Sequence, residues 1–167
     1  IPGEGDIKMT PVPSVIDLCL TTLKRYGTRT FADTVSAALA LLDEGVEVWM
    51  PKLAVTLRKM ADAEGAASGS RKDRIQAACD LFYGRGGLTG IADELEADYI
   101  EKGGFLRVQD LASHKTTLED PVSVDYRGYT ICKCGPWTQG PYLLQALRLL
   151  EGFDLRKMGE FSADAIH

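Results

Sequence analysis

The side chains best suited to nucleophilic or metal chemistry in this sequence are its four cysteines: Cys19, Cys79, Cys132 and Cys134. The first two fall on apolar faces of predicted helices, where a thiol packs as a small hydrophobic group. The other two are separated by one residue in a predicted strand, so their side chains share a face, and a disulfide between them is geometrically unfavourable. No paired Cys-x-x-Cys or His-x-x-x-His spacing is present. We therefore predict four free thiols and no zinc site.

The remaining candidates for chemistry also have simpler structural interpretations. The glycine-rich run from Gly84 to Gly90 lacks the Lys-Ser/Thr pair of a phosphate-binding loop, so we predict a structural loop that ends in an N-cap at Thr89. His114 follows a short helical segment and is predicted to be a surface or capping residue; His167 is the only other imidazole. Six carboxylates are predicted to lie on solvated helix faces: Asp62, Glu64, Asp93, Glu94, Glu96 and Asp98. The residues themselves thus indicate no catalytic residue, no cofactor-binding residue and no metal ligand.

Composition indicates one globular domain over residues 1–167, of ordinary apolar and charged content. The net charge of −5 disfavours a nucleic-acid partner, which requires concentrated Lys and Arg. No apolar run approaches the roughly 20 residues of a membrane span, and the first residues lack the apolar core of a signal peptide. The chain does not begin with Met, which suggests a processed product or a piece of a longer protein. The cellular compartment stays open.

Most of the chain has helical periodicity. Residues 1–13 form a Gly- and Pro-rich lead-in loop. Ser14 with Asp17, and Thr30 with Asp33, have the spacing of capping boxes that open two helices, which end at Gly27 and Gly45. Further helical segments are predicted from Pro51, before Gly84 and before Gly103, with a flexible loop at 65–70.

A β-hairpin and a last helix complete the predicted fold. Apolar residues alternate with polar ones before the turn at Gly128, and the same period continues after it. A helix follows from Pro141 to Glu151, with Gly152 predicted in the left-handed conformation after its end. Its polar stripe is narrow, so we expect it to be buried on most sides. The predicted fold class is α+β, mainly helical with a small antiparallel β-hairpin near residues 120–134.

The segment from Tyr126 to Phe153 carries distinctive motifs: Tyr-Arg-Gly-Tyr, Pro-Trp-Thr-Gln-Gly, Leu-Leu-Gln-Ala-Leu and Leu-Glu-Gly-Phe. Their order resembles the gamma-glutamyltranspeptidase family, although Cys134 to Gly140 stand where that family usually has a Pro-Pro-Pro-Ser-Ser-Gly-Gly-like run. Shorter likenesses to the family occur earlier in the chain, at Val12-Pro13, Arg25-Tyr26-Gly27-Thr28, Phe82-Tyr83-Gly84, Gly103-Gly104-Phe105 and Asp110-Leu111-Ala112. Residues 46–80 resemble the family only weakly.

This resemblance implies an N-terminal-nucleophile hydrolase that cuts itself into a large and a small subunit. A Thr at the start of the small subunit would transfer or hydrolyse gamma-glutamyl groups of glutathione-type substrates, with its own amine as base. That Thr would lie beyond His167, and the family's carboxylate-binding Arg would lie before Val12. We therefore expect an inactive scaffold fragment of the large subunit, without cofactor, whose partner is the missing small subunit. A homodimer through exposed apolar surface is the expected state of the isolated chain. The departure at Trp137 leaves a related acylase or amidase open, and a non-catalytic helical interaction module is a third alternative.

Overall fold

A computed structural model of the chain describes residues 5–45 and 50–167. It divides into two compact units, Ile1–Thr116 and Thr117–His167, each of which is described by itself. A single domain over 1–167 stays a prediction. Among the described residues, no helix has the length and apolar character needed to cross a membrane.

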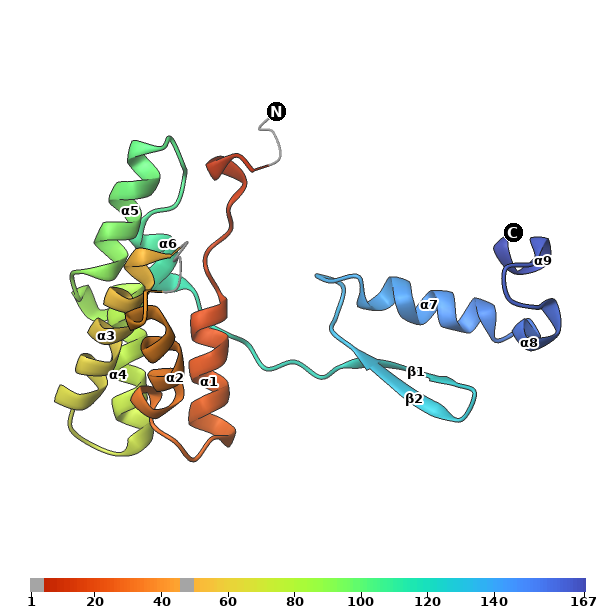
Figure 1. Cartoon of the computed structure of the whole chain (residues 1–167), viewed down its shortest axis with the longest axis horizontal. Helices are drawn as coiled ribbons and strands as arrows, with labels where there is room; N and C mark the ends of the chain where they lie inside the picture. The colour runs from red at the N-terminus through yellow and green to blue at the C-terminus, as the bar shows by residue number, and fades with distance from the viewer. Residues whose placement is uncertain (1–4, 46–49) are drawn as a thin grey trace. The chain divides into compact units, whose positions relative to one another are not determined.

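The first unit is built from helices: η1 (Ile7–Met9), α1 (Val15–Tyr26), α2 (Phe31–Asp43), α3 (Pro51–Ala66), α4 (Arg71–Tyr83), η2 (Arg85–Gly87), α5 (Ile91–Glu101) and α6 (Val108–Ser113). Helix α4 packs against α1, α3, α5 and α6, so it forms the centre of this unit (Figure 1). Its apolar stripe supplies fully buried Ile75, Ala78 and Cys79, as its helical spacing predicts.

The ends of these helices confirm some predicted caps and correct others. Thr30 and Asp33 form the expected capping box of α2. Ser14 makes no side-chain cap at α1, and the backbone N–H of Asp17, which a capping box would bond to Ser14, donates to Tyr83 Oη instead. At α5 the N-cap is Gly90 rather than Thr89, since the N–H of Gly90 donates to the Asp93 carboxylate at 2.6 Å. The predicted loop at 65–70 is shorter than expected, because α3 continues through Ala66; its flexibility stays a prediction.

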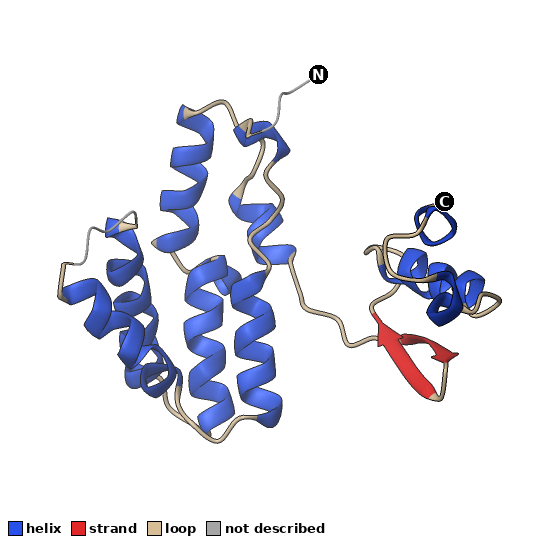
Figure 2. Cartoon of the chain, turned by 45° about the vertical axis from the view of Figure 1, so that its right-hand side comes forward, coloured by secondary structure: helices blue, strands red, loops and turns tan. Residues whose placement is uncertain are grey.

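The second unit contains a hairpin and α7 (Gly140–Leu150), followed by the single-turn helices α8 (Leu155–Met158) and α9 (Ala163–Ile166). Strands β1 (Val122–Tyr126) and β2 (Tyr129–Lys133) pair antiparallel with Val124 opposite Ile131. Arg127 and Gly128 both have positive φ, 50° and 86°, as a two-residue hairpin turn requires. Helix α7 packs against both strands (Figure 2). The mainly helical α+β class with a small hairpin is confirmed.

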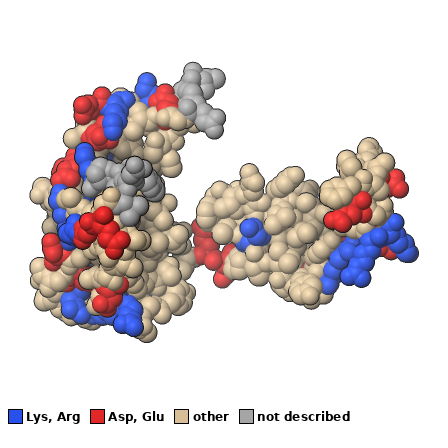
Figure 3. Space-filling view, viewed as in Figure 1, with Lys and Arg blue, Asp and Glu red and all other residues tan. Residues whose placement is uncertain are grey.

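Helix α7 differs from its sequence prediction at its end and on its surface. Gly152 is absent from the residues with positive φ, so the predicted left-handed cap is wrong; the helix ends at Leu150, and Glu151 is its C-cap residue. Leu144 is buried, but Tyr142 and Leu149 are 73% and 66% exposed. A hairpin can cover only one side of a helix, so the expected burial on most sides is not met. On the face that Figure 3 shows, this unit carries few charged side chains away from the end at α8.

Candidate functional site: a buried polar cluster around Asp17

The Asp17 carboxylate is the centre of the most extensive buried polar network in the described residues. Asp17 lies in the first turn of α1 and is 4% exposed. Its Oδ1 accepts hydrogen bonds from Cys79 Sγ at 3.0 Å and from Arg85 Nη2 at 3.1 Å. Its Oδ2 accepts from the backbone N–H of Thr116 at 2.5 Å. One carboxylate thus joins α1, α4, η2 and the segment after α6.

Tyr83 and Arg85 extend the network to further segments. The backbone N–H of Asp17 donates to Tyr83 Oη at 3.0 Å, and that hydroxyl donates to the Pro13 carbonyl at 2.6 Å. The Arg85 guanidinium lies 4.8 Å from the centre of the Tyr83 ring and donates to the carbonyl of His114 at 2.5 Å. The His114 ring stacks on Tyr83 with 5.7 Å between centroids. The hydrogen bonds of Tyr83 and Arg85 therefore connect Asp17, Pro13 and His114, which belong to separate segments of the chain.

The electrostatics of the cluster follow from burial and from these bonds. Burial by itself would raise the pKa of Asp17, but hydrogen bonds from Cys79, Thr116 and Arg85 outweigh it and hold that pKa well below its usual range. Burial and the Asp17 carboxylate together raise the pKa of the Cys79 thiol to about 12. Burial is also the main cause that raises the pKa of Tyr83 to about 12. At neutral pH the carboxylate is charged, while the thiol and the phenol are neutral.

This arrangement disfavours catalysis by any member of the cluster. A thiol is nucleophilic as its thiolate, and Cys79 remains protonated. A general base needs a pKa near the working pH, whereas Asp17 is ionised and bonded to three donors. Every donor and acceptor named above bonds to another part of the first unit. The cluster therefore fixes chain segments to one another rather than activating a substrate.

Buried Glu64 and half-buried Arg71 act in the same way. Glu64 is 3% exposed, and its carboxylate accepts from the N–H groups of Phe31 and Ala32 at 2.8 and 2.9 Å, at the start of α2. The prediction that Glu64 lies on a solvated face is therefore wrong: the unpaired N–H groups of a helix start attract it. The Arg71 guanidinium donates to four carbonyls in the last turns of α1 and in the segment that follows it, including that of Gly27 at 2.7 Å.

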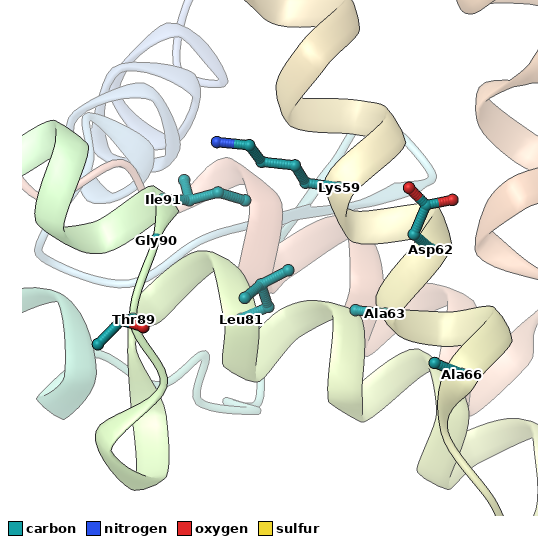
Figure 4. A pocket seen from close by; sticks show the side chains of 8 residues that line it. All are labelled: Lys59, Asp62, Ala63, Ala66, Leu81, Thr89, Gly90 and Ile91. Atoms are coloured by element: carbon teal, nitrogen blue, oxygen red, sulfur yellow. The ribbon is translucent and has the colours of Figure 1, made fainter.

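A shallow groove of about 470 Å³ lies between α3, α4 and the start of α5 (Figure 4). Its walls are Lys59, Asp62, Ala63, Ala66, Leu81, Thr89, Gly90 and Ile91. Lys59 pairs with Glu94 at 2.5 Å, and most of the remaining wall is apolar. The groove brings together no nucleophile and base.

The cysteines and histidines identified from the sequence do not form a common site in the described residues. All four cysteines are free thiols, and Cys19, Cys132 and Cys134 are exposed. Cys79 is buried as predicted, but the prediction that Cys19 packs as a small hydrophobic group is wrong. Within residues 5–45 and 50–167, no three His, Cys, Asp or Glu side chains gather as a metal site would require. His114 is the C-cap residue of α6, in agreement with its predicted capping position.

Sequence reasoning missed buried Asp17 and half-buried Arg71 and Arg85 as residues that connect distant segments. For Asp17 the local signal pointed elsewhere, since Ser14-x-x-Asp17 has the spacing of a capping box. Its Arg85 partner is 68 residues away, and no periodicity signals so distant a pair. The sequence does contain a weak signal for Arg85, which stands between two glycines directly after a predicted helix end. An exposed Arg would have no neighbouring partner at that position.

Comparisons with known proteins agree with the fold. The family model described as gamma-glutamyltranspeptidase matches residues 47–167. A glutathione hydrolase proenzyme of Pseudomonas sp. (strain A14) is 28% identical over 182 residues, which cover 93% of this chain and 31% of that protein. An acylase ACY 1 proenzyme of Pseudomonas sp. (strain SE83) is 27% identical over 187 residues, which cover 96% of this chain and 32% of that protein.

A solved structure extends the likeness to three dimensions. Helicobacter pylori gamma-glutamyltranspeptidase has a TM-score of 0.69 over 98% of this chain and 54% of that chain; at 21% identity it shows the fold alone. The chain spans about a third of the length of the two curated relatives. Because the family model matches well over half of its residues, the chain belongs to the gamma-glutamyltranspeptidase family.

Proposed function

We propose that this chain is a scaffold segment of an enzyme that transfers or hydrolyses gamma-glutamyl groups, with glutathione-type substrates. The reaction would use an N-terminal Thr nucleophile that residues 1–167 do not supply, in a small subunit that is the partner of this segment. The observation that carries the proposal is the state of the Asp17 cluster. Within that cluster the Cys79 thiol is held protonated and the Asp17 carboxylate is paired with Arg85, as suits a scaffold. Membership of the family supplies the reaction class.

A related acylase is the second candidate. One observation favours it: the acylase ACY 1 proenzyme is 27% identical to this chain, while the glutathione hydrolase of strain A14 is 28% identical. The two similarities are nearly equal over nearly the same share of the chain. Trp137 to Gly140 also replace the Ser-Ser-Gly-Gly part of the usual transpeptidase run.

Paired substrates separate these candidates. Gamma-glutamyl and glutaryl p-nitroanilide differ in one α-amino group, so a parent enzyme built for gamma-glutamyl groups should prefer the first by a large factor. We expect no release of p-nitroaniline from either substrate by residues 1–167 alone at high protein concentration. Turnover by this chain that a point substitution within it abolishes would overturn the scaffold role. A parent protein that prefers the glutaryl substrate is an acylase, and one that cleaves neither leaves a binding module.

A further inference from the structure

The outward side of α1 is an exposed apolar stripe. Within the first unit, α1 packs against α4 and lies at the edge of the helices (Figure 1). Val15, Leu18 and Tyr26 are each more than half exposed, and Cys19 is exposed beside them. These positions follow helical spacing, so they share the side of α1 that lies opposite buried Leu20.

The apolar stripe has no acidic side chain. Thr22 completes it, and its hydroxyl donates to the Leu18 carbonyl at 2.9 Å, so that polar group is satisfied within the helix. The one carboxylate of α1 belongs to Asp17, which is buried on another side. Arg25 borders the stripe, with its guanidinium 5.7 Å from the centre of the Tyr26 ring. The only charge beside the stripe that α1 supplies is therefore positive.

Further cations gather where α1 ends. The Arg71 guanidinium, at the start of α4, donates to the carbonyls of Gly27 and Arg29 at 2.7 and 2.9 Å. The first turn of α4 thus lies against the segment that follows α1, and both lie at the same end of the first unit (Figure 1). Exposed Arg29 and Lys72 therefore lie at the end of α1 that carries Arg25.

This basic end consists of the chain segments 24–29 and 70–74. The two segments contain a single carboxylate, that of Asp73, which accepts the N–H of Ser70 in the cap of α4. Asp33 of α2 is a second carboxylate near by: hydrogen bonds from Thr30 lower its pKa, and the charge of Arg29 adds to that effect. Among the described residues, no ion pair includes Arg25, Arg29 or Lys72. The cations of the basic end are Lys24, Arg25, Arg29, Arg71, Lys72 and Arg74.

We propose that the apolar stripe and the basic end together bind the surface of a bilayer that contains anionic phospholipids. Apolar side chains of a surface helix enter the boundary between headgroups and acyl chains, while nearby cations attract the lipid phosphates. Tyr26 and Arg25 suit the headgroup depth, because each has an apolar body and a polar tip. Helix α1 would lie along the bilayer rather than across it.

Charge and area disfavour a protein on this face. A second copy placed against the stripe would need a carboxylate opposite Arg25, and the one carboxylate of α1 is buried. A helix of 12 residues is about 18 Å long and about 10 Å wide, so its side offers about 180 Å². A stable protein interface buries about 800 Å² per partner. Lipid binding has no such threshold, because each apolar side chain and each cation adds to it.

Co-sedimentation of the whole chain with vesicles tests the cations. We expect binding to vesicles of equal phosphatidylglycerol and phosphatidylcholine at low salt, and loss of that binding at high salt. Arg25→Gln with Lys72→Gln should weaken binding by roughly 25-fold, since each cation contributes about fivefold. The matched control is Arg156→Gln with Lys157→Gln, which removes the same charge from exposed positions in α8 and should bind as the parent chain does.

The apolar stripe has its own variant and its own reporter. Leu18→Ser should weaken binding, whereas Val55→Ser, at a similarly exposed position of α3, should not. A polarity-sensitive fluorophore on Cys19 should shift its emission to the blue with anionic vesicles and not with phosphatidylcholine alone. For this measurement Cys132→Ser and Cys134→Ser remove the other exposed thiols.

Several results would overturn the proposal. These are no binding to the anionic vesicles, equal binding to phosphatidylcholine, or equal losses in the control variants. Bound chain with unchanged emission from Cys19 would assign the binding to another face. A blue shift without vesicles, together with a dimer in sedimentation, would assign the stripe to a second copy. Circular dichroism of each variant separates loss of binding from loss of structure.

Discussion

Substitution of Arg85 by Met removes the positive partner of the buried Asp17 carboxylate. The side chains of Arg85 and Asp17 are 16% and 5% exposed, so water cannot replace the guanidinium easily. Removal of one partner from a buried ion pair costs about 3–5 kcal/mol, because the other charge stays buried without compensation. Cys79 and Thr116 still donate to Asp17, which places the expected loss near the lower end, about 3 kcal/mol.

Urea unfolding followed by far-ultraviolet circular dichroism measures this loss in the helical first unit. Lys59→Met is the control: it also removes one cation of an ion pair, but Lys59 and Glu94 are 39% and 64% exposed. Such pairs contribute about 0–1 kcal/mol. A double variant with Asp17→Asn should recover part of the stability, because the uncompensated charge is gone.

The pH dependence gives a second readout. The pKa of Asp17 is lowered in the folded chain, so its contribution to stability is present above the ordinary carboxyl pKa of about 3.9. That contribution is lost as the pH falls through the lower, folded value. Arg85→Met should weaken this acid dependence. A loss of less than 1 kcal/mol at pH 7, together with an unchanged acid profile, would refute the account of the cluster.

Three further predictions concern other parts of the chain. Glu64→Gln should lower the free energy of unfolding by about 2 kcal/mol, because one of two charge-assisted bonds to the start of α2 is lost; Asp62→Asn, exposed on the same helix, should change it by less than about 0.5 kcal/mol. Thiol titration of the denatured, unreduced chain should count four thiols, and elemental analysis should find no stoichiometric zinc; a shortfall or one zinc per chain contradicts this. The chain should self-associate through α7. Full burial of the exposed Leu149 side chain in that contact would contribute about 1.5–3 kcal/mol to the free energy of association. A strict monomer in sedimentation that binds no hydrophobic dye contradicts this prediction.

Local patterns predicted the elements of this fold well. Thr30 and Asp33 are three residues apart and bond to one another, so the sequence contains the whole interaction. Ile75, Ala78 and Cys79 share a face by helical spacing alone, and all are fully buried. The alternation around Gly128 places the hairpin because period and turn are both local.

The same local reasoning failed where a distant group competed for a side chain. Asp17 has capping-box spacing, yet Arg85, Cys79 and Thr116 together bind its carboxylate, and the cap of Ser14 is not made. Glu64 looked like a solvated acid on α3 because its partners belong to α2. A helical pattern identifies which residues are polar, but it does not identify which helix end a buried charge will meet.

The long-range bonds of the Asp17 cluster also fix the place where the chain leaves the helical unit. Thr116 is the last residue of the first unit, and Asp17 holds its N–H. Arg85, which is bonded to Asp17, also holds the carbonyl of His114 at the end of α6. The point where the chain leaves the helical unit is therefore fixed by a buried ion pair rather than by loop sequence. The scaffold role that we propose requires such a fixed exit, since an active site assembled from several segments tolerates errors of only about 0.5 Å in their placement.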